Sequence, residues 1–323
     1  MVGYVARRLA QSIIVAVAVA FIAFAVTDHV GDPLANLVAQ DASQQERDQV
    51  AAMLGLDAPF PLRFAHYLEQ IATGNFGLSY RTREPVLKMI VDRLPASIEL
   101  SVCAILLALV IGVPMGVYCG LFPKAWLSQV FLGIAMMGIS LPTFLIGIFL
   151  ILIFSVWLGW LPAFGRGDVV AIGWWTTGLV TAGGLKALVL PTVTLGLFLI
   201  TLVIRLIRGE MLEVMREEYI RFARARGIPS LSIYFRHALK NSIVPVVTVL
   251  GLQFGSVLVF AMITETVFSW PGIGSLMIQS VTTADIPVMT TYLVMTGVLF
   301  TLINLAVDLL YLAIDPRVRL AGA

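Results

Sequence analysis

The chain has 323 residues, of which 59% are hydrophobic and only 12% are charged, and its mean hydropathy is +0.95. Soluble domains carry about 25% charged residues, which keep their surfaces in contact with water. The composition therefore excludes a soluble enzyme and indicates a helical protein that crosses a membrane several times. The net charge of +2 is too small to indicate a nucleic-acid partner.

Apolar runs long enough to cross a bilayer, about 20 residues each, recur along the chain. They cover residues 9–26, 96–122, 128–158, 187–204, 243–268 and 288–314. The first run is longer than the apolar part of a cleaved signal peptide, about 7–15 residues, which favours a retained anchor over a signal peptide. We therefore expect an all-α polytopic membrane protein with six transmembrane helices.

The third apolar run raises a question of its own, because no charge occurs between Ala125 and Gly165. If it were divided at Pro142, each half would have about 15 residues and would be too short to cross. The sequence thus favours one long helix that is kinked near Gly138 and Pro142.

Segment 169–185 is also uncharged, but it contains several glycines and the pair Trp174-Trp175. Glycine weakens a helix and tryptophan prefers the membrane–water boundary, so we expect an interfacial segment here and not a seventh span.

The distribution of basic residues supports six spans with both termini in the cytoplasm. In that topology the short cytoplasmic segments hold 13 Lys and Arg residues, namely Arg7, Arg8, Lys124, eight from Arg205 to Lys240, Arg317 and Arg319. The short outside loops hold only Arg166 and Lys186. A seventh span would place the most basic loop outside, against the positive-inside rule.

The resulting division of the chain is an anchor helix (1–28), an extracytoplasmic loop region (29–95), a membrane domain (96–315) with a cytoplasmic loop (205–242), and a tail (316–323). Within the loop region, Ser43-Gln44-Gln45-Glu46 has the pattern of a capping box and predicts a short helix that Gly55 would end. This region is either a solvated loop that packs on its own helices or a lip that receives a soluble partner.

The cytoplasmic loop contains the pattern of an amphipathic helix. Its apolar residues recur at spacings of three and four: Leu212, Met215, Tyr219 and Phe222. Gly227 stands where a C-terminal cap is expected, and Pro229 prevents continuation. Such a helix lies on lipid or inserts into the groove of a partner. Because acidic and basic residues are mixed on it, as in the pair Glu217 and Arg221, the pattern favours a protein partner.

The sequence lacks the motifs of several kinds of catalysis. It has no Gly-x-x-x-x-Gly-Lys-Ser/Thr phosphate loop and no Gly-x-Ser-x-Gly motif. The three histidines are isolated from one another and from the two cysteines, so no metal site is expected. Cys103 and Cys119 fall on one predicted helix about 24 Å apart, which is too far for a disulfide. We therefore predict a protein that is not itself an enzyme.

Ionisable groups at membrane depth are candidates for a translocation pathway. Glu99, Glu265 and Asp308 all fall near the ends of predicted spans, where water or a partner such as Arg205 would compensate their charge. Gln253 is the most central polar side chain. Each has a structural interpretation and a cargo-contact interpretation, and both stay open. A secondary carrier would normally place such groups near the midplane, which counts against that class.

One run of the cytoplasmic loop is distinctive: Glu218-Tyr219-Ile220-Arg221-Phe222-Ala223-Arg224-Ala225-Arg226-Gly227. Other runs of the same kind are Gly31-Asp32-Pro33, Arg93-Leu94-Pro95-Ala96, Asn241-Ser242-Ile243-Val244-Pro245, Thr264-Glu265-Thr266-Val267-Phe268-Ser269-Trp270-Pro271-Gly272 and Asn304-Leu305-Ala306-Val307-Asp308. With these motifs the chain resembles, from end to end, the permease subunits of bacterial dipeptide/oligopeptide ABC importers.

The resemblance implies the type I ABC importer permease fold in the bacterial inner (plasma) membrane. It also implies a heterodimer with a second permease subunit, two cytoplasmic ATPases that bind ATP and Mg, and an extracytoplasmic binding protein that delivers cargo. The ATPase-coupling residues would be Glu217, Glu218, Tyr219, Arg221, Phe222, Ala223, Arg224, Ala225, Arg226 and Gly227. Phe222 departs from the pattern, since a small residue or Thr is common there.

Relatives of this family carry dipeptides, longer peptides, glutathione or nickel chelates, and the binding protein usually selects among them. We expect di- or oligopeptides, carried by alternating access, with glutathione or nickel-chelate cargo as the alternative within the family. A stand-alone secondary carrier and a membrane scaffold without transport are the competing classes. Dependence on ATP and on a second membrane subunit distinguishes the importer subunit, the secondary carrier and the scaffold from one another.

Overall fold

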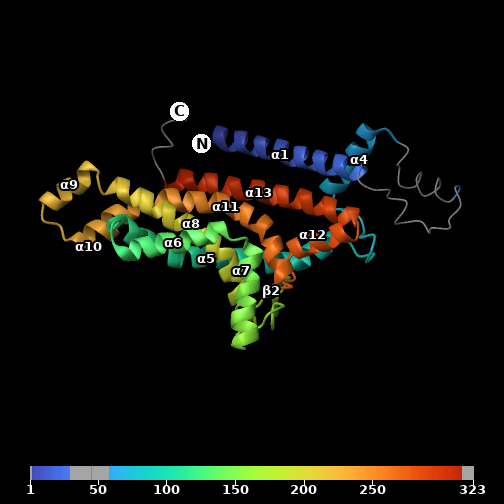
Figure 1. Ribbon diagram of the computed structural model, residues 1–323. Coiled ribbons are helices and arrows are strands. Elements are labelled where there is room, and N and C mark those ends of the chain that lie inside the picture. The colour runs from blue at the N-terminus through green and yellow to red at the C-terminus, as the bar shows by residue number, and fades with distance from the viewer. Residues whose placement is uncertain (1, 30–44, 46–57, 315–323) are drawn as a thin grey trace.

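The computed structural model describes residues 2–29, 45 and 58–314, which are mostly helical (Figure 1). The elements in chain order are α1 (Val2–His29), α4 (Phe60–Ala72), α5 (Val86–Leu121), α6 (Trp126–Ser140), α7 (Thr143–Leu150), the π-helical η1 (Ile151–Trp157), strands β1 (Val170–Ile172) and β2 (Trp175–Thr177), α8 (Ala182–Val214), α9 (Glu218–Ala225), α10 (Ser230–Ser232), the π-helical η2 (Ile233–Ala238), α11 (Leu239–Val267), α12 (Ile273–Thr282) and α13 (Ile286–Ile314).

The long helices form one bundle, with α9 at one end and α4 and α12 at the other (Figure 1); we call these the α9 end and the α12 end. Within it α5 packs on α8, α1 on α13, and α11 on both α8 and α13. In the described part of the chain, five helices are long and apolar enough to cross a membrane. They coincide with the first, second, fourth, fifth and sixth predicted spans, which are thereby confirmed as long apolar helices, whereas the total of six spans remains a prediction.

The third predicted span is not one kinked helix, and that prediction is wrong. Helix α6 ends at Ser140, residues 141 and 142 are not helical, and Pro142 (φ −59°, ψ 137°) precedes the first residue of α7. Proline lacks an N–H and disfavours a helical conformation for the residue before it. The chain therefore changes direction here, and in Figure 1 α7 projects out of the bundle, transverse to the long helices.

The predicted loop region 29–95 overlaps the beginning of a long helix, and its boundary at residue 95 stays a prediction. Helix α5 starts at Val86 and passes through Pro95. Val86 and Ile90 are buried in an apolar cluster with residues of α12 and α13 such as Ile273, and this packing stabilises the additional turns of α5. The capping-box helix predicted at 43–55 lies outside the described residues except for Gln45, which is helical.

Helix α4, in the same region, packs against α1 through aromatic rings. The centroid of the Phe24 ring, in α1, lies 5.4 Å from the ring centroid of Phe60, 5.8 Å from that of Phe64 and 5.0 Å from that of Tyr67. Phe21 adds an edge-to-face contact with Phe64 at 5.3 Å. Such pairs add about 0.5–1.5 kcal/mol beyond their buried area. The aromatic contacts thus connect the loop region to the first predicted span.

Segment 169–185 forms a β-hairpin before α8 begins. β1 and β2 are antiparallel, with Ile172 opposite Trp175, and Gly173 (φ 64°) occupies the turn. The Thr181 hydroxyl accepts a hydrogen bond from the Gly184 N–H at 3.0 Å and so caps α8. The prediction that this segment is not a helical span is confirmed, but the strands were not predicted, because the pattern of this short segment does not alternate.

The contact between α5 and α8 depends on small residues spaced four apart. Gly112, Gly116 and Gly120 lie along one face of α5. A methyl group on them would come within 2.8 Å of the Val203 Cβ, 2.7 Å of the Ile207 Cβ and 2.6 Å of the Met211 Cβ, respectively. Small residues at this spacing allow two membrane helices to approach closely.

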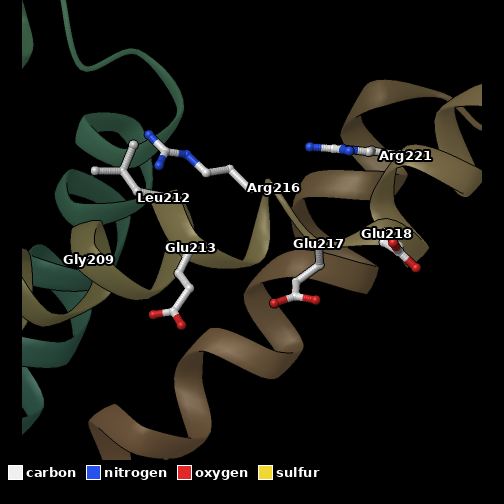
Figure 2. A pocket seen from close by; sticks show the side chains of 7 residues that line it. All are labelled: Gly209, Leu212, Glu213, Arg216, Glu217, Glu218 and Arg221. Atoms are coloured by element: carbon white, nitrogen blue, oxygen red, sulfur yellow. The ribbon is translucent and has the colours of Figure 1, made fainter.

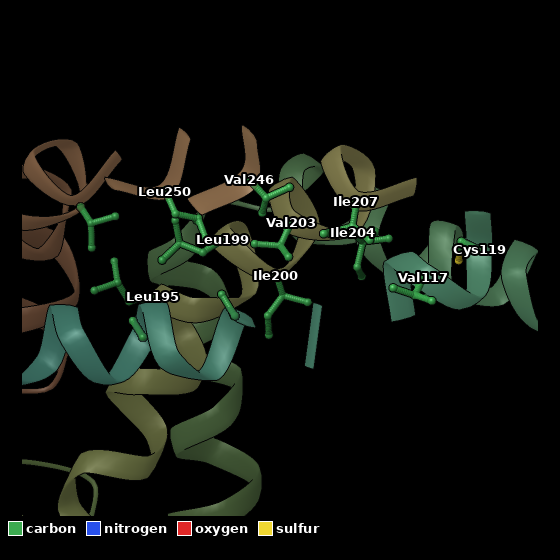
Figure 3. Packing of buried hydrophobic residues seen from close by; sticks show 14 of the residues in the cluster. Val117, Cys119, Leu195, Leu199, Ile200, Val203, Ile204, Ile207, Val246 and Leu250 are labelled. Atoms are coloured by element: carbon green, nitrogen blue, oxygen red, sulfur yellow. The ribbon is translucent and has the colours of Figure 1, made fainter. Parts of the chain in front are cut away.

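The α8 side chains on that face lie in the largest buried cluster, which Figure 3 shows. Val203 and Ile207 project there between helices, together with Leu199 of the same face and Val246 and Leu250 of α11. The two cysteines are unpaired, as the sequence predicts: Cys119 is buried in this cluster and Cys103 lies at its margin.

Candidate functional site

The amphipathic helix predicted from Leu212 to Phe222 is divided into two elements. Helix α8 continues to Val214, a turn follows, and Glu217 adopts an extended conformation (φ −62°, ψ 149°) before α9 begins at Glu218. The prediction of one continuous apolar stripe is therefore wrong. The turn allows other residues of α9 to reach the core, because the chain bends back at the α9 end (Figure 1).

Helix α9 has one buried face and one exposed face. Ile220 and Ala223 are 0% and 7% exposed and belong to the main apolar cluster. Phe222 points away from this face and is 64% exposed, and Tyr219 lies beside the buried face and is 40% exposed. The Arg226 guanidinium lies 5.6 Å from the centroid of the Phe222 ring, within the range of a cation–π contact. The face of α9 that points away from the protein is thus aromatic and basic.

The C-terminus of α9 has the geometry that the sequence predicts. Gly227 is left-handed (φ 74°), its N–H donates to the Arg224 carbonyl at 3.0 Å, and the Ile228 N–H donates to the Ala223 carbonyl at 3.2 Å. These two bonds are those of a Schellman motif, for which glycine is favoured because it has no Cβ. Pro229 follows directly. The predicted glycine cap and proline stop are confirmed.

Helix α9 is connected to a long helix as well as to α8. The Asn241 amide donates to the Tyr219 hydroxyl at 2.7 Å, and α9 packs on η2. From Ser230 to Val267 the chain is helical without a break, over 38 residues. A displacement of α9 therefore acts on α8 through the turn and on α11 through η2.

A charged cleft of about 640 Å³ lies between the end of α8 and the start of α9. It is lined by Gly209, Leu212, Glu213, Arg216, Glu217, Glu218 and Arg221. In Figure 2 the carboxylates of Glu213 and Glu217 point to one side, and Arg216 and Arg221 extend on the other. The predicted pair Glu217–Arg221 is not among the ion pairs of the described residues. These charges are therefore available to a partner.

At the α12 end three acidic side chains, those of Glu265, Glu99 and Asp285, are buried and bonded. Glu265 is 0% exposed; it accepts hydrogen bonds from the Ser97 hydroxyl at 2.5 Å and from the Ser275 N–H at 2.9 Å. Ser97 in turn accepts from the Ile273 N–H at 2.8 Å. One carboxylate thus joins α11, α5 and α12.

Glu99 and Arg166 form a second buried centre. Arg205, which the sequence suggested as a partner for a buried acid, is exposed on α8. Arg166 and Glu99 are an ion pair, and Glu99 also accepts from the Thr177 hydroxyl at 2.8 Å and from the Gly178 N–H at 3.0 Å. Arg166 lies 5.8 Å from the Trp270 ring. This group holds the β-hairpin against α5.

Asp285 provides a third centre, at the start of α13. Its carboxylate accepts from the Ser79 hydroxyl at 2.5 Å and from the Tyr80 N–H at 3.1 Å. Burial, together with the charge of Asp285, raises the pKa of the Tyr80 phenol above its usual value. The segment before α5 is thereby fixed to the segment between α12 and α13.

The other predicted pathway residues are dispersed. Gln253 is half-buried in α11, and Asp308 belongs to α13, although its side chain is not among those described. Residues that the sequence analysis did not select, Arg166, Ser97 and Asp285, complete the buried centres. In the sequence Arg166 reads only as a loop charge. Its position between an uncharged run and the tryptophan pair is the one signal that could have marked it as a functional residue. In the described part of the chain, no group of three His, Cys, Asp or Glu side chains is placed to hold a metal ion.

Comparison with known families accounts for most of the chain. Residues 112–320 match the family described as "Binding-protein-dependent transport system inner membrane component". Residues 1–101 match the corresponding N-terminal family, "Binding-prot-dependent transport system membrane comp, N-term".

Similar proteins are permeases of peptide and glutathione systems. A dipeptide transport system permease protein of Alkalihalophilus pseudofirmus is 36% identical, covering 99% of this chain and 100% of the relative. A probable peptide ABC transporter permease of Sinorhizobium fredii is 37% identical, covering 98% of this chain and 99% of the relative. A glutathione transport system permease protein of Escherichia coli K12 is 35% identical over 99% of both chains.

Among solved structures, a chain of the methionine ABC transporter MetNI in an inward-facing conformation superimposes with a TM-score of 0.52 at 19% identity, covering 68% of this chain and 93% of that chain. This likeness concerns the fold. The family matches and the near full-length relatives agree with the resemblance in the sequence motifs, and the chain belongs to the family of inner membrane components of binding-protein-dependent transport systems.

Proposed function

We propose that this chain forms half of the translocation pathway of an ATP-driven, binding-protein-dependent importer of di- or oligopeptides. The observation that carries the proposal is the position of α9. It exposes Phe222 and Arg221 to a partner, whereas its other face is buried in the main apolar cluster and packs on η2. A rigid element of this kind transmits a partner's movement to the long helices, which is what alternating access requires.

The coupling site in this proposal consists of α9 and its flanking residues. Glu217, Glu218, Arg221 and Arg224 offer charge, Tyr219 and Phe222 offer aromatic surface, and Ala223, Ala225, Arg226 and Gly227 complete the segment. Two cytoplasmic ATPases bind ATP and Mg, and one of them receives α9 of this chain. This chain itself holds no nucleotide, consistent with the missing phosphate loop.

The orientation follows from the basic residues. The α9 end is cytoplasmic, together with both termini, and the α12 end with the 29–95 region faces the other side. A second permease subunit completes the pathway, and a binding protein delivers cargo at the α12 end. Glu265, Gln253 and Asp308 stay candidates for the pathway; the bonds of Glu265 give it a structural role as well.

Peptide cargo is supported by the relatives. Permeases named for dipeptides, peptides and glutathione are 36%, 37% and 35% identical to this chain, respectively, and glutathione is itself a small peptide. Glutathione is therefore the second candidate cargo. Because these identities are so similar, we expect the binding protein, and not this chain, to determine which cargo is transported.

The test is a pull-down of the tagged chain from its own membrane in mild detergent, with mass spectrometry of the retained proteins. We expect two ATPases and a second permease subunit, and the associated binding protein can then be titrated with dipeptides and glutathione. If the chain is recovered alone or only with copies of itself, the coupling assignment is wrong and a stand-alone carrier becomes the better hypothesis.

A further inference from the structure

A short helical arm leaves the bundle near the α12 end. It comprises α7, η1 and the loop up to Phe164, and we call it the lateral arm (143–164). It contacts the rest of the protein through α7, which packs on α8 and α11, and Gly147 faces Val267 and Phe268 at the end of α11. Gly147 is the only buried residue of α7, and η1 has none. Figure 1 shows α7 projecting out of the bundle, transverse to the long helices.

The surface of the lateral arm is apolar on more than one side. Its exposed side chains include Ile148, Phe149, Ile153, Val156, Trp157 and Trp160, which are 36–70% exposed. Phe144 and Phe149, 46% and 50% exposed, are about 140° apart around α7, given ~3.6 residues per turn. A helix that is apolar all round belongs in a protein core or in lipid. A single protein partner would cover only one side.

The depth of the arm in a bilayer follows from helix lengths. Helix α6 starts at the α9 end and has 15 residues, which span about 22 Å of a hydrocarbon layer of about 30 Å. A straight continuation through η1 would add another ~22 Å and project well beyond the membrane. The break at Pro142 instead turns the arm sideways within the leaflet at the α12 end.

Tryptophans mark the far end of the arm. Trp157 and Trp160 are 70% and 65% exposed, and Trp174, on the turn of the neighbouring β-hairpin, is 65% exposed. Tryptophan is enriched where the hydrocarbon meets the lipid headgroups. The arm itself contains no charged residue. The first charged residue after it, Arg166, is buried against Glu99 and is therefore kept out of the lipid.

We propose that the lateral arm is a lipid-embedded anchor. Its helix lies obliquely among acyl chains of the leaflet at the α12 end, and Trp157 and Trp160 lie at the level of the headgroups. Because Gly147 packs on the end of α11 and the β-hairpin is fixed to α5 through Arg166, the anchor connects the surrounding leaflet to the end of the protein opposite the coupling helix.

The test is collision accessibility of single spin labels on the chain in lipid nanodiscs, measured with oxygen and with a water-soluble nickel chelate. Cys103 and Cys119 are first replaced by alanine, and Val156→Cys is compared with Ile14→Cys of α1, whose exposed fractions are nearly equal at 66% and 67%. Thr73→Cys, at an exposed polar position, is the control for water. We expect the Val156 label to favour oxygen, as Ile14 does, with the preference reversed at Thr73.

The same labels are then measured in the chain purified together with its membrane partners. Retention of the oxygen preference at Val156 supports lipid as the occupant. A preference for the nickel chelate in the chain by itself, or loss of both accessibilities on assembly, overturns the proposal in favour of water or of a protein partner. Phe149→Cys repeats the measurement in α7 in case the Val156 variant does not fold.

Discussion

At the α12 end, Glu99, Glu265 and Asp285 are 4% exposed or less and each accepts hydrogen bonds from another segment, whereas at the α9 end Glu213 and Glu217 are exposed around an open cleft. Removal of one partner from a buried charge pair is costly, but exposed charges contribute little to stability. The difference indicates that the first end is fixed by its own polar groups, whereas the charges of the second end are left exposed.

The largest effect is expected for Arg166→Ala, which leaves Glu99 buried without its counter-charge. Breaking a buried pair costs about 3–5 kcal/mol of the free energy of unfolding, measured as a lower midpoint of thermal unfolding in detergent. Lys186→Ala, an exposed residue of the same region, is the control and should change stability by less than about 0.5 kcal/mol.

A double variant refines that experiment. Adding Glu99→Gln to Arg166→Ala removes the second charge as well, so part of the lost stability should return. If Arg166→Ala unfolds at the same temperature as the unmodified chain, the ion pair does not fix the α12 end.

Glu265→Ala is expected to have the next largest effect. It leaves the Ser97 hydroxyl and the Ser275 N–H without their acceptor, and each unsatisfied buried donor costs about 1–3 kcal/mol. Glu265→Gln retains one acceptor oxygen and should lose less stability. Thermal unfolding measures both variants, and peptide uptake separates a structural role from contact with cargo: an altered KM in Glu265→Gln at unchanged stability would show that the carboxylate serves the pathway.

Gly227→Val should have a smaller and more local effect. A side chain in the left-handed region costs about 1–2 kcal/mol, and no neighbour lies within 4 Å of the added Cβ, so strain and not a clash is responsible. Hydrogen exchange should rise over α9 and uptake should fall. Gly133→Ala, which also meets open space but in a helix with ordinary φ, is the matched control; equal exchange in both variants would contradict the role of the cap.

The spans and the glycine cap could be predicted because their determinants are local. Five apolar runs fold as long helices, and Gly227 is left-handed where the chain must stop before Pro229. The turn before α9 could not be predicted from periodicity, because Leu212, Met215, Tyr219 and Phe222 fit one stripe equally well. What decides is the burial of Ile220 and Ala223 in a core formed by distant helices.

The buried polar centres could not be predicted for a related reason. Glu99 and Arg166 are 67 residues apart, with α6, α7 and η1 between them, and no local pattern pairs them. Likewise, the α5–α8 contact is visible in the sequence as glycines four apart, yet only the structure shows that Val203 and Ile207 fill the space they leave. At Pro142 the length of the apolar run could not distinguish one long helix from two shorter ones, because the length rule applies only to helices that cross the bilayer.

Phe222→Asp should change stability least and transport most. The ring is 64% exposed, so the free energy of unfolding should change by less than about 0.5 kcal/mol. The charge would nevertheless disrupt an apolar contact with an ATPase groove, and both peptide uptake and retention of the ATPases in a pull-down should be lost. Phe222→Leu, which keeps the position apolar, should retain most of both. Normal uptake by Phe222→Asp at unchanged protein level would place the coupling contact elsewhere on the α9 end, with the charged cleft as the next candidate.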